Sequence, residues 1–273
     1  MDWSPEAKKE LSRVPFFVRK RVRAKVEEEA ANNKASRVEP IHLESSKRKF
    51  MSRLSSEVRG YRLEQCFGPS GCPNRTADSS PLAAQIEDLL QEKKVLGFLQ
   101  NTLGRENVKP HHEFRVSIAE CPNACPRPQI FDVGIIGARE PDVHRESCTL
   151  CGGCVDVCRE GAICLDDAGP IIDMESCLKC GQCVDVCPAE SIFVARLGFR
   201  VQIGGRLGRR PRLAREIPGV LSEEKVLLVL KRCVDLFLDQ DPGRVKRFAY
   251  VLDDYGLDRF IRELSSEIDS VTQ

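Results

Sequence analysis

Four cysteines in two closely spaced pairs constrain the folding of this chain more than any other feature. Cys66 and Cys72 bracket the turn-forming string Gly-Pro-Ser-Gly at 68–71, and Cys121 and Cys125 lie four residues apart beside an apolar strand. Gly and Pro let the backbone fold back, so that both sulfurs of a pair can point the same way. Four thiolates are the number that a cubane iron–sulfur cluster needs, so the pairs predict one shared 4Fe-4S cluster.

The alternative is that these are four unrelated core cysteines, because free Cys is often buried. Close pairing with Gly and Pro between the members is not what packing alone selects. Asn123 and Ala124 are small and leave room for backbone N–H groups to approach the cluster sulfides. The chain has 14 cysteines and opens on no secretory signal, which favours metal binding in the reducing cytoplasm over disulfides.

Eight further cysteines form two runs that repeat with a displacement of 29 residues. The spacing within each run is two, two and three residues, the pattern of bacterial two-cluster ferredoxins, in which the fourth Cys of each run serves the other cluster. Zinc ribbons instead use two separated pairs, so iron–sulfur chemistry is favoured. The predicted ligand sets are Cys148, Cys151, Cys154 and Cys187 for one cluster, and Cys177, Cys180, Cys183 and Cys158 for the other. Cys164 and Cys233 fall outside the pattern and are predicted to be packed as small apolar residues.

Composition excludes several classes of protein. At 273 residues with 41% hydrophobic content, the chain can bury a real core. Lys and Arg number 42 against 41 Asp and Glu, which gives no overall field for nucleic acid. No apolar run approaches the length of a membrane span, so no membrane partner is expected.

Periodicity predicts helices and strands in alternation. The helices are one capped by Ser4, one over 17–31, one from Ser80 past Leu99, one capped by Ser222 and two short terminal ones; the strands cover 114–118 and 199–203. Residues 32–60 are polar and predicted to be a loop with short elements, and residues 265–273 are predicted to fray.

The order of these motifs resembles the siroheme nitrite and sulfite reductase family, closest to its low-molecular-weight sulfite reductases. The resemblance rests on Cys-x5-Cys, then Cys-Pro-Asn-x-Cys, then a Gly-x-x-Gly strand at 134–137. It implies that Cys66, Cys72, Cys121 and Cys125 hold a 4Fe-4S cluster and that Cys125 also ligates the siroheme iron.

The resemblance also implies contacts to siroheme and to an oxoanion substrate. Removing residues 141–195 brings the strand at 199–203 and its Gly-Gly end close after the second cysteine pair, as in siroheme proteins. Glycines permit close approach to a flat cofactor and arginines can bind its carboxylates, although a basic surface loop is the alternative. The expected siroheme contacts are Asn123, Cys125, Gly204, Gly205, Arg206, Arg209 and Arg210, and the expected oxoanion contacts are Arg115, Lys47, Lys49 and Arg53.

These patterns predict an α+β fold, a siroheme-reductase-like half domain with an inserted two-cluster ferredoxin domain. The expected domains are an N-terminal helical and basic segment at 1–60, a reductase domain at 61–140 plus 196–273, and the ferredoxin insertion at 141–195. The expected activity is siroheme-dependent reduction of sulfite to sulfide or nitrite to ammonia, with three 4Fe-4S clusters and a soluble donor, a ferredoxin or reductase. Larger members of the family that this chain resembles are built from two related halves, whereas this chain has essentially one. Its substrate pocket is therefore expected to be open, or to be completed by a second copy or a partner subunit. The alternative is an iron–sulfur electron-transfer subunit without siroheme catalysis.

Overall fold

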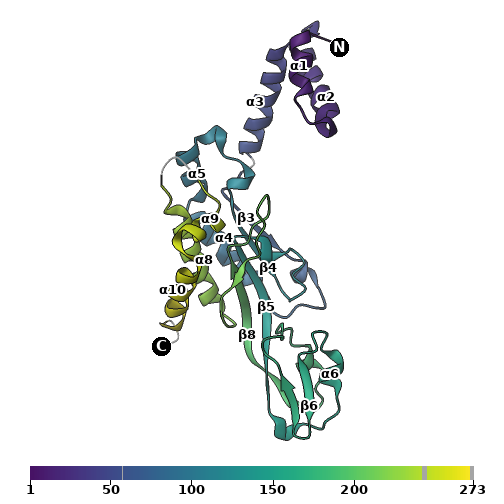
Figure 1. Ribbon diagram of the computed structural model, residues 1–273, viewed down its shortest axis with the longest axis vertical. Coiled ribbons are helices and arrows are strands. Elements are labelled where there is room, and N and C mark those ends of the chain that lie inside the picture. Colours follow the sequence, from purple (N-terminus) through teal and green to yellow (C-terminus); the bar gives the residue numbers. More distant parts are fainter. Residues whose placement is uncertain (57, 242–244, 271–273) are drawn as a thin grey trace. The chain divides into compact units, whose positions relative to one another are not determined.

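The computed structural model describes residues 1–56, 58–241 and 245–270 (Figure 1). Contacts divide the chain into two compact units, residues 1–58 with 103–110 and residues 59–102 with 111–273. Residues 103–110 thus group with the N-terminal segment, because the short helix at Arg105–Asn107 packs on the third helix of that segment. No helix among the described residues has the length and apolar composition needed to cross a membrane.

The N-terminal unit is a small helical body around a two-stranded parallel sheet. Ser4 caps its first helix by accepting a hydrogen bond from the Ala7 N–H at 3.2 Å. The core contains Trp3, Ala7, Leu11, Val26, Ala30 and Val38. Its elements are β1 (Asp2–Trp3), α1 (Pro5–Ser12), α2 (Phe16–Asn32), β2 (Arg37–Val38) and α3 (Pro40–Ser56).

The loop predicted over 32–60 is wrong, since α3 fills most of it. Pro40 stands at the start of this helix, where its missing N–H costs nothing. The acidic Glu29 on α2 binds Lys49 at 2.8 Å and Ser45 at 2.8 Å, so the polar side chains that suggested a loop instead fasten α3 to α2.

The second unit is built on a five-stranded mixed sheet in the order β3-β4-β5-β8-β9. The first three strands are parallel, and β8 and β9 are antiparallel to their neighbours. The predicted strands at 114–118 and 199–203 are both present, the second as the end of a longer strand. The strands are β3 (Tyr61–Gln65), β4 (Phe114–Ala119), β5 (Val133–Val143), β8 (Ile192–Ile203) and β9 (Arg215–Glu216).

Helices cover one side of this sheet and enclose the core (Figure 1). The Phe114 ring on β4 packs at 5.3 Å from the rings of both Phe237 and Phe248, and all three side chains are buried. Each such burial contributes about 2 kcal/mol. The helices are α4 (Ser80–Glu92), α5 (Val95–Leu103), α8 (Glu223–Leu238), α9 (Phe248–Tyr255) and α10 (Leu257–Ser270).

Three expectations about individual segments are wrong. The helix from Ser80 is broken in two, because Lys94 adopts a left-handed conformation with φ of 50°. The end of the chain does not fray from Ser265, since α10 continues to Ser270 and buries Leu264 and Ile268. Cys164 is exposed rather than packed, because it alternates with the buried Ile163 along a strand. Cys233, by contrast, is fully buried as predicted.

Strands β5 and β8 continue beyond the sheet as a two-stranded ribbon, with a register shift at Glu140/Pro141. The segment between them forms two short helices and a hairpin at the far end of the ribbon (Figure 1). These elements are α6 (Gly153–Val157), β6 (Ile163–Asp166), β7 (Gly169–Ile172) and α7 (Gln182–Asp185).

Candidate metal centre

The first two cysteine pairs meet at one edge of the sheet. Cys66 directly follows β3 and Cys121 closely follows β4, and these strands are parallel neighbours. The carboxyl ends of parallel strands lie at the same edge, and the Cys66 N–H donates to the Ile118 carbonyl at 2.9 Å. Pairing of two strands therefore brings together turns that are more than fifty residues apart in the chain.

Tight turns position the other member of each pair. Residues 68–70 form one turn of 3₁₀-helix, after which Gly71 takes a φ of 105° and the Cys72 N–H donates to the Gly68 carbonyl at 3.2 Å. In the other turn the Ala124 N–H donates to the Cys121 carbonyl at 3.1 Å, and Ala124 has a φ of 49°.

The Cys121 thiol is close enough to the other three to be affected by them electrostatically. Burial raises the pKa of the Cys121 thiol, and the nearby thiols of Cys125, Cys72 and Cys66 raise it further, while a backbone N–H of Asn123 opposes the rise. Backbone N–H groups of Gly68 and Glu120 donate to Cys66 Sγ, each at 3.3 Å. Such donors are the kind that stabilise a metal-bound thiolate.

A buried carboxylate that sequence reasoning missed supports this edge. Glu120 immediately precedes Cys121, its side chain is 1% exposed, and its carboxylate accepts from the Ser79 N–H at 2.8 Å and pairs with Arg75 at 3.2 Å. A Cβ at Gly68 would overlap the Glu120 carboxylate, which explains the glycine. A charged residue between an apolar strand and a cysteine was the available signal.

The two repeated cysteine runs have matching backbone conformations at corresponding positions of their turns, in agreement with the repeat in the sequence. Non-glycine residues Leu150 and Lys179 have φ of 57° and 58°, and Gly152 and Gly181 have φ of 79° and 75°. The Leu150 N–H donates to Cys148 Sγ at 3.3 Å, and the Lys179 N–H donates to Cys177 Sγ at 3.4 Å. Each pair of positions differs by 29 residues, the displacement found in the sequence.

Electrostatic effects show which thiols of the runs are neighbours. Burial raises the pKa of Cys154, with added effects from Cys148 and Cys151. Burial likewise raises the pKa of Cys177, and here the added thiols are Cys180 and Cys158. Cys158 therefore lies with the second run although it belongs to the first in sequence.

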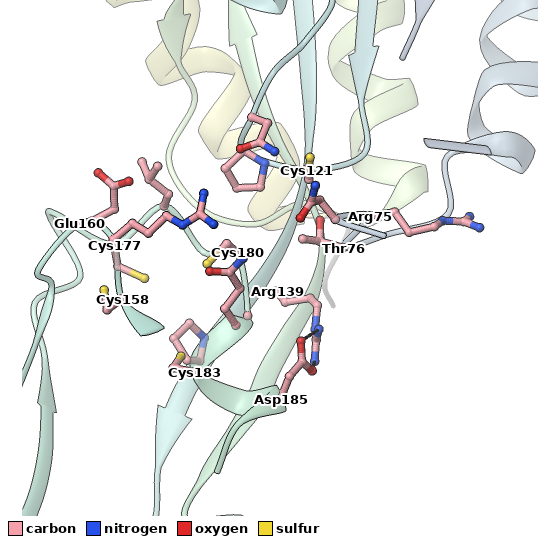
Figure 2. A pocket seen from close by; sticks show the side chains of 18 of the residues that line it. Arg75, Thr76, Cys121, Arg139, Cys158, Glu160, Cys177, Cys180, Cys183 and Asp185 are labelled. Carbon is pink, nitrogen blue, oxygen red and sulfur yellow. Dashed lines mark hydrogen bonds and ion pairs between the residues drawn. The ribbon is translucent and has the colours of Figure 1, made fainter. Parts of the chain in front are cut away.

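A cavity of about 310 Å³ lies between the second run and the edge of the sheet (Figure 2). Its lining includes Arg75, Thr76, Cys121 and Asn123 from the two sheet-edge turns, together with Cys158, Cys177, Cys180, Cys183, Arg139 and Asp185. All four thiols predicted for one ferredoxin-type cluster thus line a single cavity, which Cys121 of the sheet-edge group also lines.

Within the described residues, no three Cys, His, Asp or Glu side chains are close enough to hold one metal ion. A cubane presents a different iron to each of its four thiolates, so its ligands surround a larger volume than those of a single ion. The shared cavity and the effects of neighbouring thiols on Cys121 and Cys177 fit that larger group. The cluster ligand sets themselves remain predictions.

The predicted oxoanion-binding residues lie on two different elements, β4 and α3. Arg115 on β4 is 20% exposed, donates to the Ile130 carbonyl at 3.0 Å and lies over the Phe131 ring. Lys47 and Lys49 are exposed on α3 of the N-terminal unit, where Lys49 pairs with Glu29. Arg53 is also on α3, but its side chain lies outside the described part of the chain.

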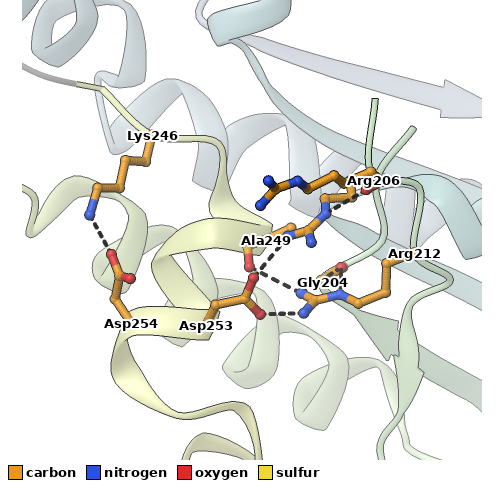
Figure 3. A network of polar contacts seen from close by, with 8 residues as sticks. Gly204, Arg206, Arg212, Lys246, Ala249, Asp253 and Asp254 are labelled. Atoms are coloured by element: carbon orange, nitrogen blue, oxygen red, sulfur yellow. Dashed lines mark hydrogen bonds and ion pairs between the residues drawn. The ribbon is translucent and has the colours of Figure 1, made fainter. Parts of the chain in front are cut away.

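Gly204 and Gly205, at the end of β8, begin a loop whose arginines form ion pairs with Asp253 on α9 (Figure 3). Arg206 donates to Asp253 at 2.9 Å, and Arg212 binds the same carboxylate and the Gly204 carbonyl. A Cβ at Gly204 would meet Leu252, and one at Gly205 would overlap backbone carbonyls of Gln129 and Phe131. These glycines therefore have a packing role in the chain itself, while Arg209 and Arg210 are exposed at the tip.

Comparison with known proteins agrees with this architecture. The family model described as "Nitrite and sulphite reductase 4Fe-4S domain" matches residues 61–271, and "Proto-chlorophyllide reductase 57 kD subunit" matches residues 3–47. The chain is 31% identical over 205 residues to the coenzyme F420-dependent sulfite reductase of Methanocaldococcus jannaschii, covering 73% of this chain and 30% of that protein. It is 28% identical over 236 residues to an uncharacterized protein of the same organism, covering 84% and 76%.

A solved structure shares the fold. The crystal structure of dissimilatory sulfite reductase I superposes with a TM-score of 0.50 and 14% identity, covering 76% of this chain and 52% of that one. This chain spans less than a third of the length of the F420-dependent relative. The family match covers most of the chain, including both cysteine pairs at the sheet edge. The chain therefore belongs to the nitrite and sulphite reductase family of iron–sulfur oxidoreductases.

Proposed function

We propose that this chain carries the siroheme-dependent reduction of sulfite to sulfide, or of nitrite to ammonia, with electrons delivered through ferredoxin-type clusters. The observation that supports it most is the convergence of Cys66, Cys72, Cys121 and Cys125 at the shared edge of β3 and β4. A relative named as a sulfite reductase favours sulfite as the substrate.

Three 4Fe-4S clusters fit the thiols present. The sheet-edge group holds one, and exchange of the fourth cysteine between the two runs is supported by the position of Cys158 beside Cys177 and by their common cavity. The proposed sets are Cys66, Cys72, Cys121 and Cys125; Cys148, Cys151, Cys154 and Cys187; and Cys177, Cys180, Cys183 and Cys158. These clusters would pass single electrons toward the sheet edge.

Differences in exposure fit the bridging role of Cys125. Cys121 is buried, whereas Cys125 is exposed, so the Cys125 thiolate is accessible to an iron outside the cluster. Siroheme, when bound, supplies the iron at which the oxoanion is reduced. The exposed Arg209 and Arg210 would bind its carboxylates, and Asn123, Gly204, Gly205 and Arg206 remain the proposed neighbours.

Cationic side chains would neutralise the oxoanion and orient it. Arg115 is the candidate within the sheet unit, and Lys47, Lys49 and Arg53 are the candidates on α3. Because the chain spans under a third of its F420-dependent relative, we also propose that a second copy, a partner subunit or a further domain completes the pocket. The many free thiols favour a reducing compartment, the cytoplasm.

The test is Cys125→Ser in anaerobically purified protein. We expect sulfite turnover with reduced viologen to fall by about two orders of magnitude, because the bridging thiolate is lost, and the coupling between haem and cluster in the EPR spectrum to disappear. Cys164→Ser, which also removes an exposed thiol but no proposed ligand, should behave as the parent. Unchanged turnover and spectra in the Cys125 variant would rule out the bridge.

A second candidate is an electron-transfer subunit without siroheme. It is favoured by the internal packing of Gly204 and Gly205 and by the engagement of Arg206 with Asp253, which leave less of this loop for a cofactor. The two functions differ in their absorption spectra. Iron–sulfur absorption without tetrapyrrole bands, after expression with full siroheme supply, would support this second function and contradict the first.

A further inference from the structure

The repeat of 29 residues allows the two cysteine runs to be compared position by position. In the second run, Asp185 forms a bidentate ion pair with Arg139 on β5, at 2.9 and 2.7 Å. The Arg139 N–H also donates to the Lys179 carbonyl at 2.7 Å. The outer face of the second run is therefore bound to a strand of the same chain.

Two further contacts cover this face. The Lys179 ammonium pairs with Glu140 at 2.9 Å, and Arg200 on β8 donates to the Leu178 carbonyl at 3.2 Å. A Cβ at Gly181 would stand 2.8 Å from the Arg139 side chain, so the fit leaves no spare room. The ribbon thus recognises this face through a basic side chain and close backbone contact.

The same face of the first run is open. Leu150, which corresponds to Lys179, is 50% exposed, and Val155 is 36% exposed. At Gly152, which corresponds to Gly181, an added Cβ would have no neighbouring atom within 4 Å among the described residues. Asp156, which corresponds to Asp185, is exposed, and within the described part of the chain its carboxylate has no ion pair.

We propose that the face formed by Leu150, Gly152, Val155 and Asp156 is the docking surface for a soluble electron-carrier protein that presents a basic side chain to Asp156. The second run shows that this face, in the same backbone conformation, binds an arginine and a backbone segment. Exposed apolar side chains beside the exposed Cys151 are typical of an interaction site. The inference rests on the proposed function, since it assigns the face at which the proposed donor binds.

The contacts of the second run with Arg139 indicate which side chains the partner should present. Arg139 meets Asp185 with both carboxylate oxygens, so a partner arginine or lysine opposite Asp156 would gain a charge-assisted contact. Leu150 and Val155 would be covered by apolar side chains around it. A rim charge of this kind acts mainly on the association rate and on its salt dependence.

Oxidised cytochrome c, a basic haem protein, is a suitable probe. Protein reduced with dithionite and then desalted should pass one electron to each ferric haem, giving ferrous cytochrome c that is followed by absorbance. We expect Asp156→Lys to slow this step about tenfold at low salt, with the effect vanishing at high salt. We expect Leu150→Ser, which removes an apolar contact without adding charge, to slow it severalfold at both salt concentrations. Reduction of the same variants by viologen, a small molecule that needs no docking surface, should match the parent.

Matched controls lie on the same module and elsewhere on the surface. Asp167→Lys places the same charge reversal on the exposed turn between β6 and β7, and Leu213→Ser places the same polar change on a leucine that is 69% exposed. Both should leave the rate unchanged. Equal slowing by the control and test variants would overturn the proposed surface.

Binding can be tested without electron transfer. A carbodiimide joins carboxylates to lysine amines in contact, so cross-linking with cytochrome c should give a peptide containing Asp156, located by mass spectrometry. Cross-links that avoid Asp156, or a self-association sensitive to Leu150→Ser, would overturn the proposal, the latter in favour of a second copy. Protein without iron–sulfur absorption would instead contradict the proposed function, so the two failures are distinguishable.

Discussion

At the residue scale, the most unusual charge in the sheet unit is Asp132. Its side chain is 2% exposed and accepts from the Arg115 N–H at 2.9 Å, and one carboxylate oxygen has no hydrogen-bond partner among the described residues. Burial raises the pKa of Asp132 to about 6, although the charges of Arg115 and Arg247 oppose the rise. A buried group of this kind makes stability depend on pH.

The sign of that dependence follows from the direction of the shift. Because the pKa of Asp132 in the folded state lies above the ordinary value of 3.8, the folded state holds a proton that the unfolded state has released. Stability therefore falls as pH rises between these two pKa values. Asn cannot ionise, so the Asp132→Asn variant lacks this loss. The difference in free energy of unfolding between variant and parent should therefore shift by about 1 kcal/mol in favour of the variant between pH 5 and pH 7. Anaerobic denaturant titrations at both pH values measure this difference. A difference that is the same at pH 5 and pH 7 would contradict the raised pKa of Asp132.

At the element scale, the ribbon of β5 and β8 depends on glycines at close approaches. A Cβ at Gly198 on β8 would overlap the Leu221 carbonyl, whereas Gly97 within α5 has only one atom near its added Cβ, at 4.0 Å. The two positions therefore predict opposite effects of the same substitution.

Gly198→Ala should lower the free energy of unfolding by about 2 kcal/mol, because backbone atoms must move apart. Gly97→Ala should raise it by about 0.5 to 1 kcal/mol, because alanine loses less conformational entropy in a helix. Denaturant midpoints of the two variants, compared with the parent, measure both effects. Similar destabilisation by both substitutions would contradict the packing described for β8.

Sequence patterns predicted elements only where their apolar period was strong. The alternation of Phe114, Val116 and Ile118 with polar residues predicted β4, and the apolar stripe after Ser222 predicted α8. Helix α3 was missed because its lysines and serines form contacts with Glu29 on α2, and no local pattern reveals such a long-range partner. The apolar pattern from Ser80 past Leu99 likewise predicted one continuous helix, which the left-handed conformation of Lys94 divides into α4 and α5.

At the scale of the whole molecule, the elements at the end of the ribbon have a core too small to be stable alone. The buried members of this core are Cys154, Ile163, Cys183 and Ile192, two of which are proposed metal ligands. Burial raises the pKa of Cys183 to about 12, so this thiol would be protonated without metal. Metal binding and folding should therefore be coupled in this part of the chain.

Removal of iron by a chelator should loosen residues 148–187 while leaving the sheet folded. We expect backbone amides in these residues to exchange hydrogen about tenfold faster or more, and those of β4, packed on Phe237 and Phe248, to change little. Hydrogen exchange followed by mass spectrometry gives both rates from one sample. Loss of protection in β4 to the same extent would show that the two regions unfold together.

The sequence by itself determined the local conformation of the cysteine runs, because Cys and Gly at fixed spacing impose the same turns wherever they occur, and both runs have them. Only the tertiary structure decided which turns meet. Parallel pairing of β3 with β4 brings Cys66 to Cys121, and Arg139 on β5 covers one run while the other stays open. Both depend on contacts between residues distant in the chain, and local patterns carry no information about those contacts.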